Sequence, residues 1–210
     1  MDLFAHTVTF FPTNQKTKKW KQAEDTKKTG FRLLSENNFK NISFQENEIT
    51  LFFDGVEYQS FKDAKGVLAI LNDFMQENLA DQHILRIVEQ KVNIVEFVLN
   101  NEVSGLTIFK ELINEKLLGN IDYIPNINYF NQSLNKISFT NENKQLNIQY
   151  AYHQANEKVG QVVLELLLQI EKKETTLNTD MFYEMNMEIF NAFHWAITES
   201  YKSVMNQDDE

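Results

Sequence analysis

Three strand-like segments in the C-terminal half of the chain constrain its fold more than any other feature. Residues 134–140, 145–152 and 159–171 are rich in β-branched, aromatic and other large apolar side chains. Short polar segments at residues 141–143 and 155–157 supply the turns between them. Connections this short cannot lead to a parallel neighbour, so the three segments are predicted to pair as an antiparallel meander.

The third of these segments is also predicted to lie inside the sheet. It contains VVLELLLQIE, whose nearly continuous apolar character is typical of a strand with neighbours on both sides.

Further strands are predicted on both sides of a hairpin signal. Asp54-Gly55 favours a hairpin because glycine adopts the positive φ of a type I′ turn, and residues 56–58 would form the return strand. The other predicted strands are residues 3–11, 31–34, 39–44, 49–53 and 84–99.

Apolar residues at three- and four-residue spacing predict three amphipathic helices. The first covers residues 61–75, and the second runs without a break from Ser104 to Gly119. The third begins near Thr179, carries Phe193 and Ile197 on its apolar face, and is predicted to be the longest. A fourth helix, with a thinner apolar stripe, is predicted over residues 14–28.

The order of these elements defines a fold class. It reads β-α-β-β-β-α twice, which predicts one α+β domain over residues 1–210, with a mostly antiparallel sheet and helices on one face. The repeated order is compatible with an internal duplication with halves 1–80 and 81–205, which is not the interpretation that we favour. The alternative is that two similar meanders recur by chance.

Composition excludes several classes of protein. The 210 residues include no Cys, which excludes a disulfide framework, a cysteine nucleophile and thiolate metal sites. The N-terminus does not resemble a signal peptide, and no apolar run approaches the roughly 18 residues of a membrane span. We therefore expect a soluble, cytoplasmic protein without membrane contact. Its net charge of −10 opposes binding to nucleic acid.

Catalytic and cofactor motifs are missing from the sequence. It contains no G-x-G-x-x-G, Walker A, G-x-S-x-G or H-E-x-x-H pattern. The four histidines, His6, His83, His153 and His194, include no pair at i, i+4 spacing. We predict no catalytic, cofactor-binding or metal-binding residue, and therefore no enzyme. Asp81 and His83 lie in a predicted loop. We favour an ordinary surface histidine there over a pair of metal ligands.

Two carboxylate patterns have alternative interpretations. Glu165 interrupts an apolar strand, so it either marks a buried site or, as we favour, lies on the exposed face of the sheet. Glu184 and Glu188 lie one helical turn apart and either chelate a cation or, as we favour, are solvated.

A basic cluster near the N-terminus is the one feature that suggests nucleic-acid contact. Lysines surround an aromatic side chain there, as in single-strand binders. A solvated helix face is the alternative interpretation. The residues are Lys16, Lys18, Lys19, Trp20 and Lys21.

From about Asp54 to its C-terminus, the chain resembles a sporadically distributed, uncharacterised prokaryotic protein family. The resemblance rests on LFFDGVEYQSFKDAKGVLAILNDF, VEQKVNIVEF, LNIQYAYH, VVLELLLQIE and IFNAFHWAITES, with good matches at Phe193 and Ile197-Thr198-Glu199. The family often has a His where this chain has Met187, so any role of that His does not transfer. Its patchy occurrence implies mobile-element or defence-associated gene neighbourhoods and no particular activity.

We therefore expect a non-enzymatic protein-interaction or accessory subunit of a phage-defence or mobile-element system. The 17 Phe residues predict apolar surface that binds another protein or a second copy, unless they all lie in the core. One alternative is a chaperone-like or antitoxin-like binder of apolar segments. Another is a saddle-like sheet that binds nucleic acid, which would require a basic concave face.

Overall fold

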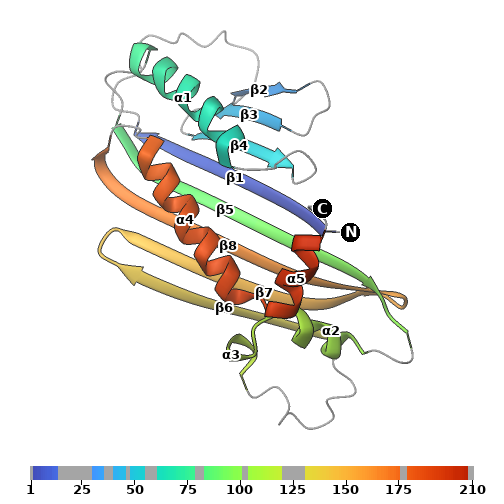
Figure 1. Ribbon diagram of the computed structural model, residues 1–210. Coiled ribbons are helices and arrows are strands. Elements are labelled where there is room, and N and C mark those ends of the chain that lie inside the picture. Colours follow the sequence, from blue (N-terminus) through green and yellow to red (C-terminus); the bar gives the residue numbers. More distant parts are fainter. Residues whose placement is uncertain are drawn as a thin grey trace.

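The described strands of the computed structural model belong to one antiparallel sheet, in the order β2-β3-β4-β1-β5-β8-β7-β6 (Figure 1). The structure describes residues 2–13, 30–35, 40–45, 48–54, 61–78, 83–100, 104–119, 131–175 and 179–207. The strands are β1 (Asp2–Thr13), β2 (Gly30–Leu34), β3 (Lys40–Gln45), β4 (Glu48–Asp54), β5 (His83–Val98), β6 (Gln132–Asn141), β7 (Lys144–Asn156) and β8 (Val159–Thr175). The helices are α1 (Phe61–Asn78), α2 (Gly105–Leu112), α3 (Glu115–Leu118), α4 (Thr179–Ala196) and α5 (Glu199–Gln207).

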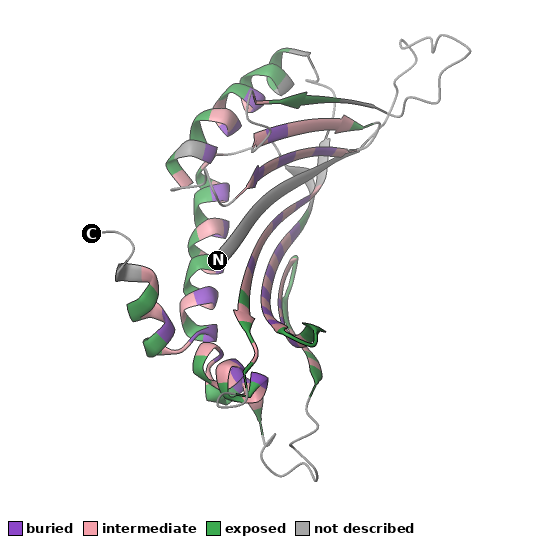
Figure 2. Cartoon of the chain, turned by 90° about the vertical axis from the view of Figure 1, so that its right-hand side faces the viewer, coloured by how far each residue is buried: buried purple, intermediate pink, exposed green. Residues whose placement is uncertain are grey.

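The sheet is curved, and the helices lie on its convex side (Figure 2). The concave side carries no described helix, and we call it the open face. This arrangement confirms the predicted α+β class with helices on one face of an antiparallel sheet. The predicted helix at 14–28 and the return strand at 56–58 lie outside the described residues.

The two halves of the sheet have the same strand order. From edge to centre, the first half runs β2-β3-β4-β1 and the second runs β6-β7-β8-β5, and β1 pairs with β5 where the halves meet. Each half contains an 18-residue helix, α1 or α4, so α4 is not longer than α1, although its sequence predicted the longest helix. The duplication itself stays a prediction.

Alternation along β8 builds the core between sheet and helices. Its apolar side chains on one face are almost fully buried, at Val162, Leu164, Leu166, Leu168 and Ile170. β8 lies between β5 and β7, as its apolar sequence indicated. Each large buried side chain of this kind stabilises the fold by roughly 1.5–3 kcal/mol relative to an exposed one.

Two predicted helices are each interrupted at one point. The helix expected from Ser104 to Gly119 is two helices, because Ile113 is extended and forms an isolated bridge with Ile197. The same bridge ends α4 at Ala196, so Ile197 does not belong to its apolar face. Both isoleucines are buried, and burial of this pair outweighs the continuation of either helix.

Within the described ranges, no helix combines the length and the apolar character that a bilayer span requires.

Candidate binding surface

Helix α4 has one face that packs on the sheet and two faces that do not. The buried face consists of Phe182, Met185, Ile189, Phe193 and Ala196, spaced three and four residues apart. Such spacing keeps side chains on one side of a helix. The other two faces also carry large apolar side chains, which makes α4 unusual for a helix on the surface of a sheet.

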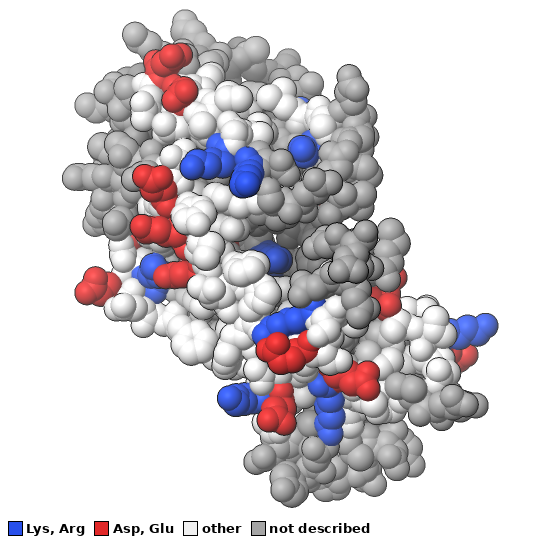
Figure 3. Space-filling view, in the orientation of Figure 1, with Lys and Arg blue, Asp and Glu red and all other residues white. Residues whose placement is uncertain are grey.

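The first exposed face is a row of large side chains that we call the α4 stripe, formed by Tyr183, Met187 and Phe190. Their exposed fractions are 52%, 38% and 45%. His194 continues the row, with its ring centroid 4.2 Å from that of Phe190. Figure 3 shows uncharged side chains over much of α4, with charged groups along the margins. Contiguous apolar surface of this kind commonly marks an interaction site.

The second exposed face of α4 borders a pocket of about 580 Å³ against the β6–β7 hairpin. Its walls are mostly apolar and include Phe139 and Leu146 from the strands and Trp195 from the helix. An ion pair crosses its rim, with Lys144 Nζ 2.5 Å from a carboxylate oxygen of Glu188. A pocket with apolar walls and one polar pair suits a large apolar side chain.

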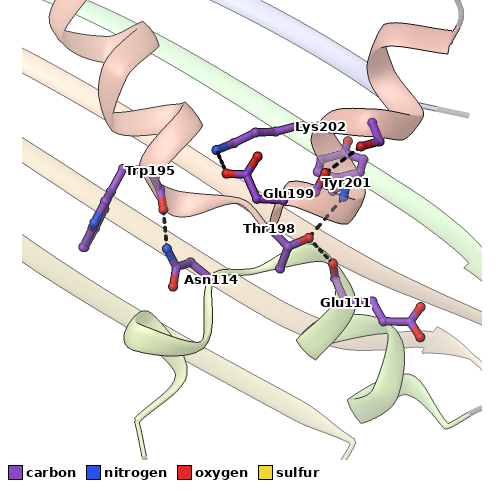
Figure 4. A network of polar contacts seen from close by, with 8 residues as sticks. Glu111, Asn114, Trp195, Thr198, Glu199, Tyr201 and Lys202 are labelled. Atoms are coloured by element: carbon purple, nitrogen blue, oxygen red, sulfur yellow. Dashed lines mark hydrogen bonds and ion pairs between the residues drawn. The ribbon is translucent and has the colours of Figure 1, made fainter.

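Hydrogen bonds fix the backbone at the junction between α4 and α5, next to Trp195 (Figure 4). Asn114 donates a hydrogen bond through Nδ2 to the Trp195 carbonyl, at 2.8 Å. The Thr198 hydroxyl donates to the Glu111 carbonyl and accepts from the Tyr201 backbone N–H at 3.1 Å. Thr198 therefore caps α5 and ties it to α2. Threonine is a common helix N-cap, so the sequence Thr198-Glu199 indicates a helix start that we did not predict.

Three polar residues of β5 face the helices rather than the open face. Glu89 and Asn93 are 0% and 2% exposed, and Lys91 lies between them on the same side of the strand. Asn186 Nδ2 donates to Glu89 Oε1 at 2.9 Å, and the Tyr201 hydroxyl donates to Asn93 Oδ1 at 3.2 Å. The Nδ2 of Asn93 has no hydrogen-bond partner among the described residues. Burying polar groups at this depth costs free energy unless they are hydrogen-bonded, so these two bonds offset part of that cost.

Lys91 is a partly buried cation in this layer. Its Nζ lies 4.2 Å from the centroid of the Phe193 ring, a cation–π distance. Burial lowers the pKa of Lys91 from 10.5 to about 8, although the nearby Glu89 carboxylate acts to raise it. The folded protein therefore releases this proton more easily than the unfolded chain does.

That difference predicts a pH-dependent gain in stability. Between pH 8 and 10.5 the unfolded state binds more protons at Lys91 than the folded state, so unfolding becomes harder as pH rises. Lys91→Met removes this term. The free energy of unfolding of the wild type, relative to Lys91→Met, should rise by about 2 kcal/mol between pH 7 and 9.5, as measured by urea denaturation. Parallel pH profiles would contradict a lowered pKa.

The described histidines form no shared site. His153 lies on the open face, and His194 packs on Phe190. Burial lowers the pKa of His194, with Lys202 and Lys91 acting in the same direction. The side chains of His6 and His83, and residue Asp81, lie outside the description. No group of three His, Asp or Glu residues suited to a metal occurs among the described residues.

The residues of the two carboxylate patterns lie in different environments. Glu165 lies on the open face, where Gln90 Nε2 and Gln149 Nε2 donate to it at 2.5 and 3.0 Å. Glu188 forms the ion pair with Lys144, and Glu184 is exposed.

Over the residues that the structure describes, the open face lacks the basic character that nucleic-acid binding would require. Among its described charged residues, the basic ones are Arg32, Arg86 and Lys136, and the acidic ones are Glu48, Asp54, Glu96, Glu165 and Glu171. The basic cluster of Lys16, Lys18, Lys19, Trp20 and Lys21 lies outside the described residues.

No protein-family model, curated protein or solved structure matches this chain. The resemblance noted above therefore stays a prediction.

Proposed function

We propose that this protein is a non-enzymatic interaction subunit that binds another protein, or a second copy of itself, through the exposed faces of α4. The observation that carries the proposal is the α4 stripe beside a pocket with apolar walls. These side chains lie outside the core, although a different face of α4 is fully buried in it. Aromatic residues and Met are enriched in the cores of protein interfaces.

Charge supports a protein partner over nucleic acid. The chain has a net charge of −10, and the described open face is more acidic than basic. Phosphate backbones are bound by clustered Lys and Arg. With the neighbourhoods that the resemblance implies, we further propose an accessory role in a cytoplasmic phage-defence or mobile-element system.

Two substitutions on the α4 stripe test the proposal. Met187→Glu combined with Phe190→Glu should reduce recovery of a specific partner from native cells at least about tenfold, because two apolar anchors are lost. The measurement is quantitative mass spectrometry of material that co-purifies with tagged protein. Sedimentation of the purified protein at micromolar concentration reports self-association in the same way.

The control places the same charge elsewhere on the surface. Gln76→Glu combined with Ser200→Glu changes two exposed positions outside the stripe and should leave recovery unchanged. A strictly monomeric wild type with no partner that the stripe variant loses would refute the proposal.

A further inference from the structure

Strand β6 is an edge of the sheet and has little protection against pairing. Among the described strands, it pairs only with β7, in a register that runs without a bulge from Gln132 to Asn141. It contains no proline and one charged residue, Lys136. Natural edge strands are usually kept from pairing by prolines, bulges or several charges. Leu134 and Phe139 are nevertheless 69% and 50% exposed.

These two apolar residues lie on opposite faces of β6. Phe139 faces the helices and forms part of the pocket wall with Trp195. Leu134 is an odd number of residues away, so it lies on the open face, together with Lys136. A helix docked in the pocket would cover Phe139 and leave Leu134 in water. An added strand would place side chains beside both, because its residues also alternate between the two faces.

A second copy of the chain is a poor source of that strand. A symmetric antiparallel pair of β6 strands that covers both apolar residues within the strand is centred on Lys136 or on Ile137. Centring on Lys136 places two lysines opposite each other and puts serines opposite Leu134 and Phe139. Centring on Ile137 puts Thr140 opposite Leu134 and Asn135 opposite Phe139. Neither register places an apolar residue directly opposite Leu134 or Phe139.

The charge of Lys136 indicates which kind of segment from another protein would suit the edge of β6. Lys136 is exposed, and no described carboxylate pairs with it. The residue opposite Lys136 on an added strand would lie on the same face, within reach of the ammonium group. A carboxylate there is the complementary choice.

We infer that β6 is the docking edge for an extended segment of another protein, which adds a ninth strand with apolar side chains opposite Leu134 and Phe139 and a carboxylate opposite Lys136. Backbone hydrogen bonds to the edge supply affinity, and the pocket beside Phe139 supplies specificity. The inference rests on the proposed function, and it names the part of the partner that the protein binds.

A designed peptide tests this inference on the intact protein. The probe is a fluorescein-labelled, ten-residue peptide for antiparallel pairing, with Phe opposite Phe139, Leu opposite Leu134, Glu opposite Lys136 and Thr at most other positions. It should bind with a dissociation constant on the order of 10 μM by fluorescence anisotropy. A shuffled peptide of the same composition should bind at least about tenfold more weakly. Hydrogen exchange should slow in β6 amides when the designed peptide is present.

Charge reversal gives the sharpest control. Lys136→Glu should weaken binding of the designed peptide about fivefold and strengthen, by a similar factor, binding of a peptide with Lys in place of Glu. Lys136 is exposed, so the variant should fold normally. Equal binding of designed and shuffled peptides, unchanged preference after charge reversal, or protection of α4 instead of β6 would each overturn the inference.

The α4 stripe variant separates this inference from the proposed function. It leaves β6 and the pocket residues intact, so it should bind the designed peptide as the wild type does. If the peptide fails while partner recovery still depends on the stripe, the edge is not the docking site and the proposed function stands. If no partner depends on the stripe, the proposed function fails, whatever the peptide does.

Discussion

Replacing Phe182 by Asp should lower the free energy of unfolding by more than about 4 kcal/mol. Phe182 is 0% exposed on the buried face of α4, so the substitution removes a large apolar side chain and places a carboxylate in the apolar layer. Circular dichroism during urea denaturation measures the effect. Native-like stability in this variant would show that the buried face of α4 is wrongly assigned.

The same substitution at Phe193 and at Phe190 should lower the free energy of unfolding by smaller amounts. Phe193 is 3% exposed, but Lys91 Nζ lies 4.2 Å from the centroid of its ring. Phe193→Asp would give the new carboxylate an ammonium partner and should therefore cost less than Phe182→Asp. Phe190→Asp, on the stripe and 45% exposed, should cost less than about 1 kcal/mol. A different order among the three would contradict the packing of α4.

The sheet could be predicted where the local pattern and the tertiary environment agree. In β8, Glu165 alternates with buried leucines, and the strand has neighbours on both sides as its sequence indicated. The predicted bounds of β6, β7 and β8 differ from the observed ones by at most four residues at either end, because polar turns delimit these strands.

Predictions were wrong where distant residues decide the backbone. Ile113 and Ile197 are helix-compatible in sequence, yet each is extended in the bridge that joins them. No local signal reveals a contact between residues so far apart in the chain. Their burial between α2, α4 and α5 decides the outcome.

Strand β5 reverses the usual relation between polarity and exposure. In the middle of the strand, the apolar residues Val88, Val92 and Ile94 face the open side, and Glu89, Lys91 and Asn93 lie under the helices. Alternation alone would place the polar side chains in water. The buried cluster could not be predicted, because a strand pattern defines two faces without saying which one a distant helix covers.

The candidate binding surface escaped prediction for a similar reason. Tyr183, Met187 and Phe190 are large side chains like the buried residues of α4, and both sets have helical spacing. The excess of Phe indicated that some apolar surface would stay exposed. Only the packing of α4 on β5 and β8 reveals which side chains these are.

Gly105→Ala should destabilise the protein by about 3 kcal/mol, although Ala is the better helix former. A Cβ at Gly105 would lie 1.9 Å from the Tyr152 hydroxyl oxygen. Tyr152 is 2% exposed and packed between the rings of Phe97 and Phe109, at centroid distances of 6.2 and 6.1 Å, so it cannot yield. Thermal and urea denaturation measure the loss.

Two comparisons decide whether this clash is the cause. Gly66→Ala, in α1, meets no atom within 4 Å and should stabilise the protein by roughly 0.5–1 kcal/mol through helix propensity alone. In a Tyr152→Leu background, which lacks the clashing atoms, Gly105→Ala should cost less than in the wild type. If Gly105→Ala instead stabilises the protein as Gly66→Ala does, Tyr152 moves freely and does not hold α2 against β7.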